Sequence, residues 1–164
     1  MTKALITGIT GQDGTYLADF LLKKGYDVIG TYRRTSHKSF ERLEAFDILS
    51  KVDVIRADLT DQISLNKAIK DTKPDEVYNL AAQSFVGASF DQPMLTSNVT
   101  GLGAMRLFEA VKEFSPNSKI YQASSSEMFG NTDEIKSEDS RLYPASPYGI
   151  AKVFAHKSAQ HYRK

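Results

Sequence analysis

Tyr148 and Lys152 are four residues apart, and together they have the side chains needed for proton chemistry. A helix running from Tyr148 towards Lys164 would place both on one face near its start. An ammonium group near a phenol and a cofactor ribose stabilises the phenolate, lowers the tyrosine pKa and leaves a usable base at neutral pH. Most pairs with this spacing are ordinary surface pairs, so the surrounding sequence decides what this pair means.

Ser124-Ser-Ser-Glu127 is the second candidate for chemistry, because it follows a predicted strand at 118–123. Open α/β sheets bind ligands at the carboxyl ends of their strands, where Ser125 and Glu127 would then lie. A serine run before a glutamate is more often a turn or a cap. Its occurrence with the tyrosine–lysine pair and an N-terminal glycine loop favours a catalytic site.

The glycine loop is Gly8-Ile-Thr-Gly-Gln-Asp-Gly14, between a short apolar run and a helical pattern. Strand, loop and helix in this order indicate a dinucleotide-binding site. Gly8 permits the turn, Gly11 lets the backbone approach a pyrophosphate, and Gly14 lets the helix lie close to the strand. Asp13 is unusual beside an anion, so we expect its side chain to point away and cap the helix.

The segment after the second predicted strand indicates the cofactor. An NAD-binding protein usually has an acid there to bind the ribose 2′-hydroxyl, but this chain has Arg33-Arg-Thr-Ser36. Two guanidinium groups followed by two hydroxyls suit a 2′-phosphate, so the sequence predicts NADP. The alternative is a solvated basic loop.

Apolar runs and helical patterns alternate along the chain. Strands are predicted at 3–7, 27–32, 52–56, 75–79 and 118–123, and helices near 14–24, 40–49, from 61, 93–114 and 148–164. This alternation predicts an α/β fold, a Rossmann-type parallel sheet with helices on both faces and strand order 3-2-1-4-5. The predicted cofactor-binding residues are Gly8, Thr10, Gly11, Gln12, Asp13, Gly14, Arg33, Arg34, Thr35, Ser36, Asp58, Leu59, Leu80, Ala81, Ala82, Gln83, Ser84, Tyr148 and Lys152.

Composition excludes several other classes of function. The 164 residues suit one domain, and a formal net charge of +1 argues against nucleic acid or an anionic membrane as the main partner. Without cysteine there is no disulfide, thiol nucleophile or cysteine-ligated metal, and we predict no metal site. No stretch is long enough to span a bilayer, so we expect a cytoplasmic protein. His37, His156 and His161 match no motif and are interpreted as surface residues.

Together these motifs resemble the GDP-mannose 4,6-dehydratase family, in the sugar-nucleotide branch of the extended short-chain dehydrogenases/reductases. The resemblance covers nearly the whole chain but only about the first half of the family's length. Glu127 narrows it to dehydratases and nucleotide-sugar decarboxylases, because epimerases of this branch generally lack that carboxylate. The motifs that carry it are 5–14, Arg33-Arg34, 58–61, 81–84, 123–130 and 146–152.

The resemblance implies a role for each of four catalytic residues. Tyr148 removes the C4 hydroxyl proton while hydride passes from C4 to NADP, and Lys152 holds the ribose. Ser125 hydrogen-bonds O4. Glu127 takes the C5 proton and helps the C6 hydroxyl leave as water, before hydride returns to C6. The implied product is GDP-4-keto-6-deoxymannose, with NADP regenerated.

In the family, further strands and a GDP-sugar-binding domain follow the catalytic helix. We therefore expect 1–164 to be an NADP-binding Rossmann domain without a substrate domain, inactive alone. Its expected partners are GDP-mannose or a related nucleotide sugar, a second copy in a dimer or tetramer, and a second chain or C-terminal half. Two functions remain open: a dehydratase of this branch or its N-terminal half, and a non-catalytic NADP-binding or dimerising module.

Overall fold

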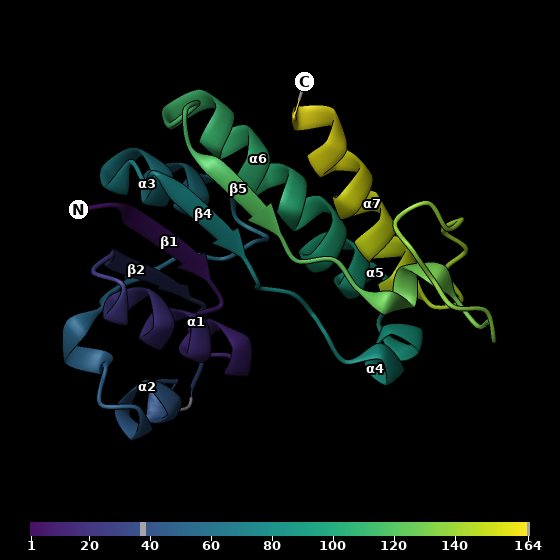
Figure 1. The fold of residues 1–164 in the computed structure, drawn as a ribbon, viewed down its shortest axis with the longest axis horizontal. Helices are drawn as coiled ribbons and strands as arrows, with labels where there is room; N and C mark the ends of the chain where they lie inside the picture. Colours follow the sequence, from purple (N-terminus) through teal and green to yellow (C-terminus); the bar gives the residue numbers. More distant parts are fainter. Residues whose placement is uncertain (37–38, 164) are drawn as a thin grey trace.

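A parallel five-stranded sheet runs through the middle of the molecule (Figure 1). The computed structural model describes residues 1–36 and 39–163. The strand order is β3-β2-β1-β4-β5, as the sequence predicts. The strands are β1 (Lys3–Thr7), β2 (Asp27–Tyr32), β3 (Asp53–Arg56), β4 (Glu76–Asn79) and β5 (Lys119–Gln122).

Helices cover both faces of the sheet, which confirms the predicted α/β fold. In Figure 1, α1 and α2 lie on one side, while α3 and α6 lie on the other with α7 beside α6. A π-helix at Ser97–Leu102 joins α5 to α6, and 3₁₀ turns lie at Leu49–Lys51 and Ser126–Phe129. The α-helices are α1 (Gln12–Lys23), α2 (Glu41–Ala45), α3 (Gln62–Thr72), α4 (Val86–Asp91), α5 (Pro93–Thr96), α6 (Gly103–Phe114) and α7 (Pro147–Tyr162).

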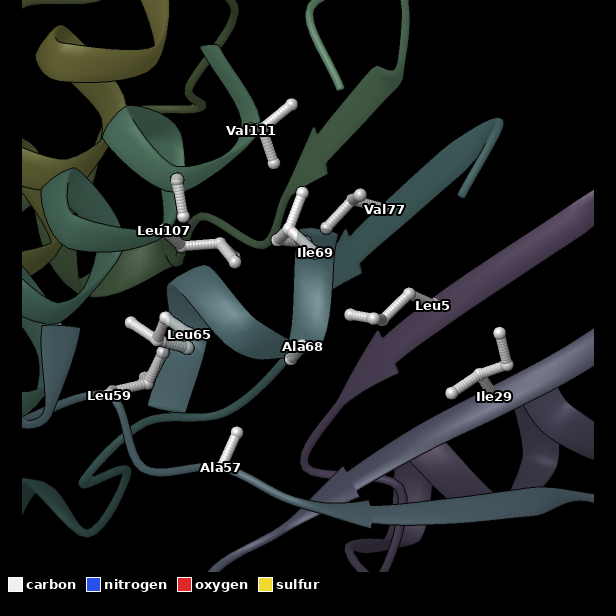
Figure 2. Packing of buried hydrophobic residues seen from close by; sticks show 11 residues of the cluster. Leu5, Ile29, Ala57, Leu59, Leu65, Ala68, Ile69, Val77, Leu107 and Val111 are labelled. Carbon is white, nitrogen blue, oxygen red and sulfur yellow. The ribbon is translucent and has the colours of Figure 1, made fainter. Parts of the chain in front are cut away.

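Two apolar layers hold these helices to the sheet, because alternate residues of each strand point to opposite faces. Leu5 and Val77 face α3 and α6, where they pack with Ile69 and Leu107 (Figure 2). Ile6, next to Leu5 in the chain, packs instead with residues of α1. Both faces of β1 are therefore buried, which explains why its three central residues, 4–6, are all apolar.

Helix starts follow the sequence where a side chain caps them. Asp61 accepts a hydrogen bond from the Ile63 amide at 3.1 Å, and Ser146 accepts one from the Gly149 amide at 3.0 Å. The prediction that Asp13 caps α1 is wrong. The N-cap of α1 is Gly11, so the helix begins within the glycine loop. Asp13 is an exposed residue of its first turn.

The helix predicted at 93–114 is not uniform, since its middle forms the π-helix. Gly103 lies so close to the loop after β3 that a Cβ there would meet Leu59 Cβ at 2.8 Å. Arg106 spans this wide turn, with Nη1 donating to the carbonyl of Asn98 at 3.2 Å and Nη2 to its side-chain oxygen at 2.8 Å. Nη1 also donates to the Leu59 carbonyl oxygen at 3.2 Å, so contacts with the loop after β3 accompany the departure from a regular helix.

Two other elements differ from the prediction. The helix expected at 40–49 ends at Ala45, because Asp47 is in a left-handed conformation with φ of 53°. Helix α4 is new, and its six residues are too few to show an apolar period. Within the described residues, no helix combines the length and apolar character needed to cross a membrane.

Candidate active site

The loops that follow β1 to β4 line a groove of about 420 Å³ at the carboxyl ends of the strands. Arg34 lines an adjoining cavity. Gln12, Asp13, Gly14, Thr35, Ser36, Tyr148 and Lys152 do not line the groove. Its walls contain the other predicted cofactor residues: Gly8, Thr10, Gly11, Arg33, Asp58, Leu59, Leu80, Ala81, Ala82, Gln83 and Ser84.

Two glycines of the first loop, Gly8 and Gly14, have the steric roles that the sequence predicts. Gly8 has φ of 72°, a left-handed conformation that favours glycine. A Cβ at Gly14 would lie 2.4 Å from the Gly8 carbonyl oxygen and 2.8 Å from Ile9 Cα, so only glycine lets α1 begin this close to β1. The groove therefore has a wall of backbone where β1 ends.

A buried polar network joins three strand ends beneath the groove. The Thr7 hydroxyl donates to Asn79 Oδ1 at 2.7 Å and accepts from the amides of Leu80 and Ala81, both at 3.1 Å. Asn79 Nδ2 donates to Gln122 Oε1 at 2.7 Å. The network fixes the loop after β4, and no sequence pattern predicts it, because it joins residues far apart in the chain.

Lys152 lies in the interior at the start of α7, with 4 % of its surface exposed. Its Nζ donates to the Ala123 carbonyl oxygen at 3.0 Å and is 5.7 Å from the centroid of the Tyr148 ring. Burial lowers the pKa of Lys152, because the charged form loses hydration. The helix thus places this cation against the end of β5 and beside the phenol, as the spacing predicts.

Ser125, Glu127 and Tyr148 meet at the same place. The Ser125 hydroxyl accepts from the Glu127 amide at 3.2 Å and caps the 3₁₀ turn. Burial raises the pKa of Tyr148, a hydrogen bond with Ser125 lowers it, and the Glu127 carboxylate raises it further. The four predicted catalytic residues therefore form one cluster.

The expectation that Lys152 lowers the pKa of Tyr148 needs a correction. The pKa of Tyr148 is raised, because its burial outweighs the hydrogen bond from Ser125. Burial cannot be inferred from the four-residue spacing. In this structure Ser125 is the residue that favours the phenolate.

Gly149 explains how α7 comes so close to the serine segment. A Cβ at Gly149 would lie 2.6 Å from the Glu127 carbonyl oxygen and 3.0 Å from Pro144 Cβ. Glycine directly after Tyr148 therefore lets the helix start against the 3₁₀ turn. The signal was present in the sequence as the Tyr-Gly dipeptide, but glycine inside a helix is not by itself diagnostic.

The histidines only partly match their interpretation as surface residues. His161 is exposed, whereas His156 is half-buried and its Nδ1 is 2.9 Å from Ser124 Oγ. Its Nε2 is 3.2 Å from Gln160 Nε2, which can only donate, so Nδ1 carries the proton if the amide is oriented in this way. His37 lies outside the described residues.

The fold and this site define a class of protein. The strand order, the glycine loop after β1 and the tyrosine–lysine pair on α7 are those of a Rossmann-type dinucleotide-binding domain of the short-chain dehydrogenase/reductase kind. The chain belongs to the GDP-mannose 4,6 dehydratase family, whose sequence model matches residues 5–164.

Individual relatives agree with this family. GDP-mannose 4,6 dehydratase 2 of Arabidopsis thaliana is 48% identical over 98% of this chain and 46% of its own length, and the Homo sapiens GDP-mannose 4,6 dehydratase is 46% identical with the same coverage. The chain thus spans about half the length of these curated relatives. The structure of Thermus thermophilus UDP-glucose 4-epimerase complex with NAD has 26% identity and a TM-score of 0.87, over 98% of this chain and 50% of that one.

Proposed function

We propose that residues 1–164 are the NADP-binding, N-terminal half of a GDP-mannose 4,6-dehydratase, which converts GDP-mannose to GDP-4-keto-6-deoxymannose. The observation that carries the proposal is the convergence of Ser125, Glu127, Tyr148 and Lys152 at the end of β5. An acid beside the tyrosine provides the second proton acceptor that a dehydration needs. A simple alcohol oxidation would need only the tyrosine.

The groove has the features that a dinucleotide requires. A Cβ at Gly11 would meet only the Gly8 carbonyl oxygen within 4 Å, so the backbone there is open to a phosphate. Gln83 Oε1 is buried in the groove wall with no hydrogen-bond partner in the described residues. A ribose hydroxyl or a carboxamide would satisfy it. The NAD complex of the Thermus thermophilus epimerase supports a nicotinamide dinucleotide, and Arg33 and Arg34 favour NADP.

When bound, NADP supplies a reversible acceptor for the hydride of the substrate C4. Tyr148 takes the proton of the C4 hydroxyl, and the Ser125 hydroxyl stabilises the phenolate by its hydrogen bond. Lys152 orients the ribose and holds a positive charge near the phenol. Glu127 then removes the C5 proton, acidified by the new C4 ketone, and delivers a proton to the C6 hydroxyl, which leaves as water. The C5=C6 double bond that results would take back the hydride at C6 and a proton at C5, which gives the 4-keto-6-deoxy product.

We further propose that the chain binds NADP(H) alone but needs the remaining half for turnover. It spans 46% of the length of its Arabidopsis thaliana relative, while all the predicted cofactor contacts lie within it. Orientation of a substrate supplies about 7–11 kcal/mol of a barrier, so an unpositioned GDP-sugar would not react at a measurable rate. A non-catalytic NADP-binding module is the alternative, and the acid at Glu127 argues against it.

The test uses an active assembly of this chain with the remaining half. Glu127→Gln should still oxidise C4, so NADPH accumulates, which its absorbance reports, while no 4-keto-6-deoxy product forms. Tyr148→Phe should abolish both signals, because the first proton is no longer removed. Glu134→Gln, in the exposed loop, is the matched control and should behave as wild type.

Normal turnover by Glu127→Gln would contradict the dehydratase assignment. It would leave an epimerase-like reaction or a binding role as the better account.

A further inference from the structure

A polar cavity of about 560 Å³ adjoins the cofactor groove where β2 and β3 end. The two share Arg33 and Asp58 in their walls, so the groove continues into the cavity. Beyond these residues the cavity wall adds Arg34, Arg56 and Asp61. Three guanidinium groups therefore surround one space, and Arg56 belongs to none of the motifs found in the sequence.

Arg56 reaches the cavity from a different strand than the other two arginines. It is the last residue of β3 and is paired in the sheet with Tyr32, directly before Arg33. Its side chain is exposed. In the described part of the chain, no ion pair or hydrogen bond involves the guanidinium of Arg33, Arg34 or Arg56, although all three line the same cavity.

The two carboxylates in the wall have local hydrogen-bond donors. Asp58 Oδ1 accepts from the Thr60 amide at 2.9 Å and from its hydroxyl at 2.7 Å, and Asp61 Oδ1 accepts from the Ile63 amide. Their charges nevertheless remain in the wall and offset those of Arg33 and Arg34. Three arginines and two aspartates leave the wall with a net positive charge, and loss of Arg56 would leave two charges of each sign.

We propose that Arg56 is a third arginine that binds the 2′-phosphate of the adenosine ribose, and that it decides whether the cavity attracts this phosphate. The inference rests on the proposed use of NADP. A phosphate monoester carries about −1.5 to −2 charges at pH 7, which a neutral wall would not hold. Arginine also offers paired donors that match the oxygens of a phosphate.

Calorimetry with two probes that differ only in the 2′-phosphate tests this. Wild-type chain should bind adenosine 2′,5′-bisphosphate more tightly than AMP. Arg56→Gln should weaken binding of the bisphosphate about tenfold and of AMP less than about twofold, because only the 2′-phosphate contact is lost. The affinity of Arg56→Gln for the bisphosphate should also depend less steeply on salt concentration than that of wild type, because one cation fewer contacts the phosphate.

Two further variants separate charge from structure. Arg56→Lys should keep most of the affinity, whereas Arg163→Gln, at the exposed end of α7, should bind as wild type. If Arg56→Gln keeps the wild-type preference for the bisphosphate over AMP, the inference about Arg56 is overturned but the NADP proposal is not. A wild-type chain that binds both probes equally overturns the NADP proposal as well.

Discussion

A hydrogen bond from the Ser125 hydroxyl lowers the pKa of Tyr148 against the effect of its burial. Burial and the Glu127 carboxylate both raise the pKa of Tyr148, and the Ser125 hydrogen bond opposes them. The rate of C4 oxidation should therefore rise with pH as the phenol loses its proton. In the active assembly, Ser125→Ala should move this rise to higher pH, and Ser125→Thr should restore it.

The measurement is the pH dependence of NADPH formation from GDP-mannose under single-turnover conditions. Ser126→Ala is a suitable control, because the neighbouring side chain is exposed. If Ser125→Ala lowers the maximal rate but the rate still rises at the same pH, Ser125 does not set the pKa of the phenol.

Lys152, a predicted catalytic residue, is a buried cation that should cost stability. The residue is 4 % exposed and burial lowers its pKa, and its ammonium donates to the Ala123 carbonyl oxygen. Lys152→Met should therefore be neutral or raise the free energy of unfolding by about 1 kcal/mol at pH 7, while it weakens NADP(H) binding.

The pH dependence of this difference follows from the lowered pKa. The folded state binds fewer protons than the unfolded chain between the folded-state pKa and the ordinary lysine value of 10.5. Below this pH range the buried charge lowers the free energy of unfolding by its full amount, and the effect disappears as the pH rises through the range. Urea unfolding at several pH values measures this, and a large loss of stability in Lys152→Met at pH 7 would contradict it.

At the scale of elements, the network at the ends of β1, β4 and β5 should be important for stability. Thr7→Val keeps the shape of the side chain but leaves the Leu80 and Ala81 amides without their acceptor. We expect a loss of about 2 kcal/mol in the free energy of unfolding. Thr31→Val is the control, because this threonine is 4 % exposed and its hydroxyl makes no hydrogen bond within the described residues.

Equal costs for the two threonine variants in urea unfolding would show that the network contributes little. Because Thr7→Val also frees the loop after β4, the variant should bind NADP(H) more weakly than wild type.

The elements differ in how far the sequence predicts them. Strand β1 and its glycine loop are predicted well, because one apolar run and the glycine at position 14 have a direct steric meaning. The π-helix is not predicted, since it depends on contacts of Arg106 and Gly103 with residues elsewhere. The upward pKa shift of Tyr148 was missed for the same reason, because burial is a property of the folded chain.

At the scale of the whole molecule, exposed apolar side chains on neighbouring helices support the predicted self-association. Leu95 and Leu102 are 43% and 45% exposed on α5 and the π-helix, and Ile150 and Phe154 are 57% and 40% exposed on α7. Helix α7 packs against both of the other elements. Burial of such surface gains about 25 cal/mol per Å², so we expect a dimer through these helices.

Light scattering of wild-type chain and Phe154→Asp measures this. The variant should shift the mass towards a monomer, because a carboxylate would be buried at the interface. Phe20→Asp, which changes a 53% exposed phenylalanine on α1, should leave the dimer intact. A monomeric wild type, or dissociation by Phe20→Asp as readily as by Phe154→Asp, would contradict the predicted interface.

The central claim for the whole molecule is that this half of a dehydratase is itself an NADP-binding domain. Calorimetric titration of the 164-residue chain with NADPH and, in the same buffer, with NADH tests it most directly. The arginines that line the end of the groove predict that NADPH binds at least about tenfold more tightly, a difference of about 1.4 kcal/mol. Binding of NADH as tightly as NADPH, or of neither nucleotide, would contradict the claim.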